Sequence, residues 1–230
     1  MISAPALFFS LIGGIIPAII WLFFWLREDT RRPEPRGRIM VTFICGMLAV
    51  PLVIPFQQWT NIPQNPLMTF LMWASIEELF KFGAAYLAAI RTKDDNEPLD
   101  PLIYMMTAAL GFVALENSLY ILQPLIGGNI VDSLITGNIR FVGSSLLHTI
   151  SSATIGLSMG LSFYKGKYSK QLYLAVGIVL AILLHTAFNF FIIKSATSIT
   201  LTTLGFVWIA IVILMLFFER IKKVYPVNNI

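Results

Sequence analysis

Seven apolar windows, each long enough to cross a bilayer as a helix, follow one another along the 230-residue chain. A membrane-spanning helix needs about 20 apolar residues, because lipid offers no partner to backbone N–H and C=O groups. The windows lie near residues 3–26, 38–56, 67–90, 101–123, 139–163, 171–193 and 199–218. We therefore expect an all-α polytopic membrane protein, a bundle of about seven transmembrane helices that forms a single domain over residues 1–230.

The composition supports a surface that faces the lipid bilayer. Charged residues make up 12% of the chain, whereas a soluble domain carries about 25%. This excludes a disordered chain and a nucleic-acid module with a basic face. Cys45 is the single cysteine, so a disulfide within the chain is also excluded. The expected location is the cell membrane, with several passes.

The basic residues indicate an orientation. Lys and Arg cluster in connections 27–38, 91–100 and 164–170 and in the C-terminal tail, whereas connections 57–66, 124–138 and 194–198 offer Lys194 alone, with Arg140 at a helix edge. Cytoplasmic loops collect Lys and Arg. The N-terminus is therefore predicted outside and the C-terminus in the cytoplasm.

Several polar residues fall inside the apolar windows instead of in the connections. They are Glu77, Glu78, Lys81, Glu116, His148 and His185, with the amides of Asn117 and Asn189. An ionisable group at the bilayer centre costs about 2.5–3.5 kcal/mol on insertion scales, so such groups face each other or water. With a rise of about 1.5 Å per residue, four consecutive helices place a titratable side chain roughly 10–17 Å below the outer surface. One shared site can result.

Two adjacent glutamates and a lysine form the densest part of this set. Lys81 lies four residues after Glu77 and three after Glu78. A Glu that precedes Lys by four residues is the better arrangement on a helix. We therefore expect Lys81 to engage Glu77 and to leave Glu78 as the freer base. The alternative interpretation is an ion pair that only locks helix packing.

Helix 139–163 also carries small residues in step with its histidine. Ser144, His148, Ser152, Gly156 and Gly160 recur every four residues. Such a stripe allows close helix contact, and we interpret it as a packing seam that contains the histidine.

The order of these motifs resembles a known family. The motifs are E-E-x-x-K at 77–81, F-x-x-x-E at 112–116, His148 in the next window and H-x-x-x-N at 185–189, after the segment Pro33-Glu34-Pro35-Arg36. Together they resemble the PrsW family of intramembrane endopeptidases, which is distantly similar to CAAX prenyl endopeptidases and bacteriocin-processing membrane proteins. The sequence departs from the family pattern at Ser144, where Phe is frequent, and at Asn189, where Asp is frequent.

The resemblance implies cleavage of a single-span membrane protein at a peptide bond in or near the bilayer. Members of the family are associated with site-one cleavage of anti-sigma factors. By position, the resemblance implies a functional set of Glu77, Glu78, Glu116, His148 and His185, with Lys81 and Asn189 in support.

Two chemistries remain open for this set. In the favoured one, without a cofactor, Glu78 or Glu77 activates water while His148 and His185, the latter held by Asn189, stabilise the oxyanion. In the other, Glu78, His148 and His185 bind Zn²⁺ and leave a fourth position for water.

Two non-peptidase classes compete with both chemistries. Buried Glu and His residues also form proton relays in transporters, although no inverted repeat supports a proton-coupled transporter here. In a non-catalytic scaffold, the same polar groups would act only as interhelical contacts.

Overall fold

The computed structural model describes residues 3–27, 29, 32–194 and 201–225, and in these ranges the chain is helical with no strand. The helices are α1 (Ala4–Leu26), α2 (Arg36–Trp59), α3 (Pro66–Ala85), α4 (Asp100–Ile126), α5 (Ile130–Leu161), α6 (Lys167–Lys194) and α7 (Leu201–Ile221), and α3 continues into a π-helical turn, η1 (Tyr86–Ile90). The all-α class is therefore confirmed. The first two residues of the predicted window 199–218 lie outside the described ranges.

Helix α5 corrects one of the predicted connections. We expected a loop over 124–138, but α5 already begins at Ile130. The Asn129 side chain caps it by accepting a hydrogen bond from the backbone N–H of Asp132, at 3.1 Å, which satisfies one of the free donors of the first turn. The helix is therefore longer than a bilayer requires, and Arg140 lies well inside it instead of at its edge.

Within the described ranges, four helices are long and apolar enough to cross a membrane: α1, α2, α4 and α6, the last over Lys167–Phe190. This agrees with a multi-pass membrane protein. Helix α3 differs because it carries Glu77, Glu78 and Lys81 within its 20 residues. The count of seven spans and the orientation stay predictions.

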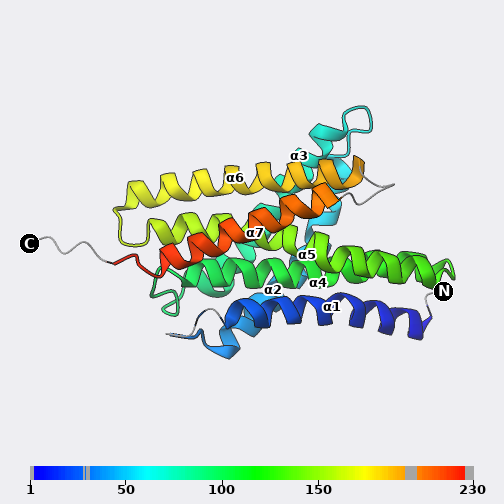
Figure 1. Ribbon diagram of the computed structural model, residues 1–230, viewed down its shortest axis with the longest axis horizontal. Helices are drawn as coiled ribbons and strands as arrows, with labels where there is room; N and C mark the ends of the chain where they lie inside the picture. Colours follow the sequence, from blue (N-terminus) through cyan, green and yellow to red (C-terminus); the bar gives the residue numbers. More distant parts are fainter. Residues whose placement is uncertain (1–2, 28, 30–31, 195–200, 226–230) are drawn as a thin grey trace, which may run out of the picture.

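Helix α4 lies at the centre of the bundle. It is buried at every residue from Asp100 to Ala114 and packs against α1, α2 and α5. In Figure 1, α1 and α6 lie on opposite sides of the molecule, with α4 and α5 between them. The site residues Lys81 of α3 and His148 of α5 contact α4 at Phe112 and Glu116, inside the bundle and not at its outer surface.

Two glycines allow α2 and α4 to cross in close contact. A Cβ at Gly111 would lie 2.0 Å from the carbonyl oxygen of Phe43, and a Cβ at Gly46 would lie 2.1 Å from that of Ala108. Each helix therefore places its backbone where a side chain of the other would otherwise stand. Close approach of this kind is typical of helix packing in membranes.

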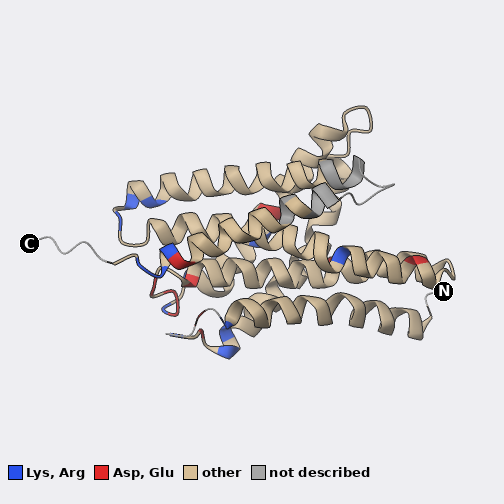
Figure 2. Ribbon diagram, in the orientation of Figure 1, with Lys and Arg blue, Asp and Glu red and all other residues tan. Residues whose placement is uncertain are grey.

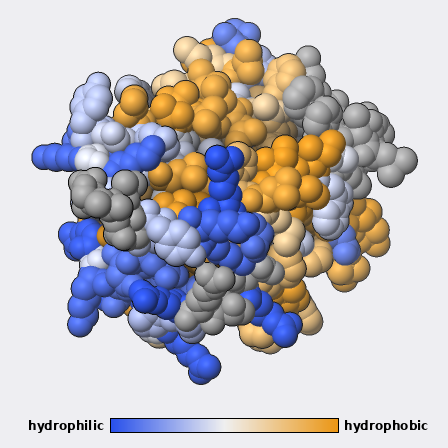
Figure 3. Space-filling view, turned by 60° about the vertical axis from the view of Figure 1, so that its left-hand side comes forward, coloured by the Kyte–Doolittle hydropathy of each residue, from blue (hydrophilic) through white to orange (hydrophobic). Residues whose placement is uncertain are grey.

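Most of the charged residues gather at one end of the bundle, where α1 and α7 end and α6 begins (Figure 2). Figure 3 turns this end forward and shows hydrophilic residues over it and hydrophobic residues over the adjoining flank. The basic connections therefore lie on one side, as the alternation of charge along the sequence requires. A cytoplasmic location for this end remains our prediction.

We expect Gly111→Ala to destabilise the protein, because the new methyl group would meet the Phe43 carbonyl and force α2 and α4 apart. Overpacking of this kind costs about 1–3 kcal/mol. The matched control is Gly143→Ala in α5, where a Cβ meets nothing within 4 Å. Thermal unfolding in lipid nanodiscs should show a lower midpoint for the first variant alone, and equal midpoints would contradict the close crossing.

We also expect the charged end to face the cytoplasm. In a Cys45→Ala background, Asn61→Cys and Gly166→Cys place single thiols in two exposed connections, α2–α3 and α5–α6. A membrane-impermeant maleimide should label residue 61 on intact cells and residue 166 only after permeabilisation. The reverse pattern would show that the orientation is inverted.

Candidate active site

Helix α3 brings two carboxylates and an ammonium into the bundle interior. Glu77 is 4% exposed, and Glu78 and Lys81 are fully buried. Successive side chains on a helix point about 100° apart, so the two glutamates cannot share one set of partners. Glu78 bonds Ser152 of α5 and His185 of α6. Glu77 bonds Gln57 of α2 and directs its other oxygen at the space between the two histidines.

The Glu78 carboxylate is saturated with partners. One oxygen, Oε1, lies 2.5 Å from Lys81 Nζ and 2.8 Å from His185 Nδ1. The other, Oε2, accepts a hydrogen bond from Ser152 Oγ at 2.7 Å. Our expectation that Lys81 would engage Glu77 is therefore wrong. The helix rotation turns Glu78 towards Ser152 and His185, and the preference for a spacing of four is too small to oppose this packing.

The Glu77 carboxylate is the freer of the two. Its Oε1 accepts a hydrogen bond from Gln57 Nε2 at 2.7 Å. Its Oε2 is buried and has no hydrogen-bond partner among the described residues. This oxygen lies 3.7 Å from His148 Nδ1 and 3.6 Å from His185 Nε2. Both imidazoles therefore present a nitrogen to the Glu77 oxygen that lacks a hydrogen-bond partner.

Each histidine uses its second nitrogen on a different glutamate. His185 bonds Glu78 through Nδ1, and His148 Nε2 lies 3.2 Å from Glu116 Oε2. The two rings meet edge to face with centroids 4.8 Å apart. Lys81 Nζ also lies 2.9 Å from His148 Nδ1. The ammonium therefore links Glu78 on α3 with His148 on α5.

Glu77, His148 and His185 have the composition and spacing of a metal site. One atom from each lies within 4.8 Å of the other two. In tetrahedral zinc coordination with bonds of about 2.0–2.1 Å, ligand atoms lie about 3.4 Å apart, which is a few tenths of an ångström from the distances around Glu77 Oε2. A bound cation would provide the partner that Glu77 Oε2 lacks. The carboxylate expected in a zinc site was Glu78, and the structure places Glu77 there instead.

Arg140 is a member of the site that the sequence did not predict. Its Nη2 lies 2.5 Å from Glu116 Oε2 and 3.0 Å from Ser144 Oγ, and its Nε donates to Asn117 Oδ1 at 2.6 Å. The guanidinium carbon lies 3.8 Å above the Tyr120 ring centroid. Arg140, Ser144 and His148 follow one another at steps of four, which is the signal that could have identified it.

The small-residue stripe of α5 serves two purposes. Ser152 bonds Glu78, so this part of the stripe belongs to the site. A Cβ at Gly156 would lie 2.5 Å from Leu102 Cα at the start of α4, and a Cβ at Gly160 would lie 2.3 Å from the oxygen of Pro98, which precedes α4. The expected close contact between helices therefore holds at Gly156, whereas Gly160 packs against the connection before α4.

Asn189 does not take the part expected for it. We expected Asn189 to hold His185, but the ring is bonded through Nδ1 by Glu78 instead. Asn189 is half-buried, and no hydrogen bond joins it to His185 among the described residues. The rotation of α6 that points His185 at Glu78 leaves the amide, one turn later, outside the network.

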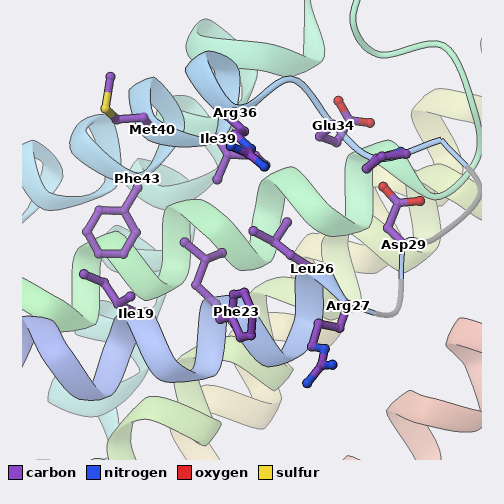
Figure 4. Close-up of a pocket in the computed structure, with 12 residues that line it drawn as sticks. Ile19, Phe23, Leu26, Arg27, Asp29, Glu34, Arg36, Ile39, Met40 and Phe43 are labelled. Carbon is purple, nitrogen blue, oxygen red and sulfur yellow. The ribbon is translucent and has the colours of Figure 1, made fainter.

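A separate pocket of about 640 Å³ lies between α1 and α2 and contains none of these residues (Figure 4). Glu34, from the Pro33-Glu34-Pro35-Arg36 segment, lies at its polar edge and accepts a hydrogen bond from Tyr104 on α4. Burial, and then the hydrogen bond with Asp100, raise the pKa of Glu34 to about 9. The segment therefore places a buried carboxyl group at this end of the bundle.

Comparisons with known proteins agree with these observations. The model of a family described as PrsW family intramembrane metalloprotease matches residues 34–218. The chain is 29% identical over 194 residues to Protease PrsW of Geobacillus kaustophilus, with 80% of each chain covered. It is 28% identical over 227 residues to Protease PrsW of Oceanobacillus iheyensis, with 94% of this chain and 97% of that one covered. No solved structure matches significantly.

We expect Glu78→Gln and Glu77→Gln to differ in stability. Glu78→Gln leaves Lys81 buried without its counter-charge, and breaking a buried pair in this way costs about 3–5 kcal/mol. Glu77→Gln retains the shape of the side chain and breaks no close ion pair. Thermal unfolding should therefore show a large loss for Glu78→Gln and a small change for Glu77→Gln. A larger loss for Glu77→Gln would contradict the observed pairing.

Proposed function

The chain belongs to the PrsW family of intramembrane metalloproteases, and from this premise we propose that Glu77, His148 and His185 hold a divalent metal ion, zinc first among the candidates, at the centre of a membrane-embedded peptidase. The observation that carries the proposal is the partnerless Oε2 of Glu77 between two imidazole nitrogens. Two imidazoles and one carboxylate form a common ligand set of catalytic zinc sites, which keep one position for water.

The charges of the site suit a divalent cation. Three carboxylates, Glu77, Glu78 and Glu116, lie close to two cations, Lys81 and Arg140. One negative charge is therefore left over when both histidines are neutral, and it lies on Glu77, the residue that faces the imidazoles. A neutral imidazole is also the form that binds a metal.

The neighbouring glutamates orient the two imidazoles. A hydrogen on His185 Nδ1, held by Glu78, leaves the lone pair of Nε2 directed at Glu77. A hydrogen on His148 Nε2, held by Glu116, leaves the lone pair of Nδ1 directed at the same oxygen. Carboxylates commonly hold metal-binding histidines in this way. Lys81 neutralises Glu78, so this carboxylate can remain buried.

When bound, the metal ion would lower the pKa of a water molecule and polarise the scissile carbonyl. The chain itself would exclude bulk water, since Glu77, Glu78, His148 and His185 are each at most 4% exposed. The Lys81 ammonium, between Glu78 and His148, is the buried cation closest to these groups and would stabilise negative charge that develops on the substrate.

One observation favours a second chemistry, which dispenses with the metal. Lys81 Nζ lies 2.9 Å from His148 Nδ1, the nitrogen that a metal would use. If the ammonium stays there, Glu77 is the carboxylate free to accept a proton from water, and His185 would stabilise the oxyanion. This alternative retains the glutamate chemistry predicted from the sequence but exchanges Glu78 for Glu77 as the base.

The substrate that suits this site is a single-span membrane protein. The side chains of Glu116 and Arg140 are 17% and 18% exposed, so the site approaches the surface beside them. Leu119 and Tyr120, three and four residues after Glu116 on α4, are 42% and 48% exposed. An unwound part of an apolar helix could reach the site from there, and an anti-sigma factor is the substrate class that the resemblance suggests.

We expect the full-length protein in lipid nanodiscs to lose cleavage of a single-span test substrate after chelation and to regain it with Zn²⁺. Glu77→Gln should lose bound zinc as well as cleavage, because it removes a ligand. The matched control is Glu34→Gln, which changes another buried glutamate, distant from the site in the α1–α2 connection. It should retain both zinc and activity.

Full cleavage by protein shown to be free of metal would overturn the metal assignment and support Glu77 as the base. Zinc bound equally by the Glu77→Gln protein would show that a different set of residues holds it.

A further inference from the structure

Arg140 is held by several contacts at the edge of the site, beside Glu116. It bonds Glu116 and Ser144 through Nη2 and Asn117 through Nε, and its guanidinium stacks on Tyr120 at 3.8 Å. A planar guanidinium has donors in a rigid fork, so each of these contacts restricts the others. Such an arrangement determines the position of the group that it binds.

A short hydrogen-bonded circuit strengthens this position. Asn117, which accepts from Arg140, donates through Nδ2 to Ser145 Oγ at 3.4 Å. The Ser145 hydroxyl donates in turn to the backbone oxygen of Arg140 at 3.2 Å. The side chain of Arg140 is thereby linked back to its own helix through α4. Neither helix can rotate without breaking the circuit.

The same oxygen of Glu116 that Arg140 binds also meets His148. Arg140 Nη2 lies 2.5 Å from Glu116 Oε2, and His148 Nε2 lies 3.2 Å from it. We propose that Arg140 is a positioning residue for His148: it fixes the Glu116 carboxylate, which in turn holds the hydrogen of His148 on Nε2 and directs Nδ1 at Glu77. This inference rests on the proposed function, in which His148 Nδ1 is a metal ligand.

The physical reason lies in the choice between two ring nitrogens. An imidazole exists in two neutral forms, and the hydrogen bond at one nitrogen determines which form is present. Without Arg140, Glu116 would be free to turn away from His148, and its partly buried charge would have no close counter-charge among the described residues other than Lys81. His148 would then lose the acceptor at Nε2, which selects its form together with the Lys81 ammonium at Nδ1.

If Arg140 had only a structural role, different results would be expected. As a clamp between α4 and α5, it would alter the unfolding midpoint, and its effect on metal binding would not depend on Glu116. As a positioning residue acting through Glu116, it would have little further effect once Glu116 is removed. A double-mutant cycle on metal affinity separates the two.

The experiment measures Zn²⁺ affinity by competition with a chromophoric chelator, on the full chain in nanodiscs after removal of bound metal. The variants are Arg140→Gln, Arg140→Lys, Glu116→Gln and Arg140→Gln with Glu116→Gln. The control is Arg38→Gln, which breaks another arginine ion pair, with Asp94 at 2.7 Å, that has no contact with the histidines. The unfolding midpoint of each variant is measured in parallel.

Residues that orient a metal ligand typically affect affinity by about 10–100-fold, and Arg140 acts one step further away. We therefore expect Arg140→Gln to weaken Zn²⁺ binding about tenfold, Arg140→Lys to weaken it less, and Arg38→Gln to leave it unchanged. In the Glu116→Gln background, Arg140→Gln should change the affinity by less than about twofold.

Unchanged affinity in Arg140→Gln would overturn the inference, as would an equal loss with and without Glu116. If Arg140→Gln does not fold, Arg140→Lys with and without Glu116→Gln completes the cycle under the same criterion. If the unaltered protein binds no Zn²⁺, the proposed function fails and the inference fails with it, whereas zinc binding insensitive to Arg140 defeats the inference alone.

Discussion

The ion pair between Lys81 and Glu78 is the contact on which the other polar groups of the bundle depend. Both side chains are fully buried, with Nζ and Oε1 2.5 Å apart. Each ion loses several kcal/mol of hydration when it is buried, and their attraction offsets this loss only if the remaining donors and acceptors are also satisfied. Ser152, His185 and His148 satisfy them. Helices α3, α5 and α6 are thereby fixed in mutual register.

The close packing of α4 makes this register possible. Gly46 and Gly111 bring α2 against α4, and Gly156 brings α5 against its beginning. Because α4 is buried on all sides over these turns, the helices around it are set at short, fixed distances. Glu116 and Asn117 then lie one turn beyond the tightest crossing, where α5 presents Arg140. The glycines thus set the width of the space in which the ionisable groups meet.

The sequence was sufficient for the fold class and for the convergence of the glutamates of α3 with Glu116, His148 and His185. The apolar windows predict the seven helices, and depth alone predicts that Glu116, His148 and His185 converge with the α3 glutamates. Depth says nothing about rotation, however. Because of the rotation of α3, Lys81 pairs with Glu78. Because of the rotation of α6, His185 bonds Glu78 instead of Asn189.

Arg140 was not predicted for a different reason. A window of apolar residues marks the part of a helix that lies in the bilayer, whereas α5 continues past it because Asn129 caps it earlier. Arg140, which was predicted at the edge of the helix, therefore lies well inside it, two turns before His148. Gln57 was not predicted either, because a single amide near the end of an apolar window carries no periodic signal.

The adjacency of Glu77 and Glu78 acquires a physical meaning from these contacts. Two neighbouring helix positions point about 100° apart, so one helix can direct a carboxylate at α6 and another at the space between the histidines. The first is neutralised by Lys81 and holds His185, and the second retains a free oxygen. If the lysine bonded Glu77 instead, the oxygen facing both imidazoles would already be paired. The pairing of Lys81 with Glu78 is therefore what leaves Glu77 able to bind a cation or to accept a proton.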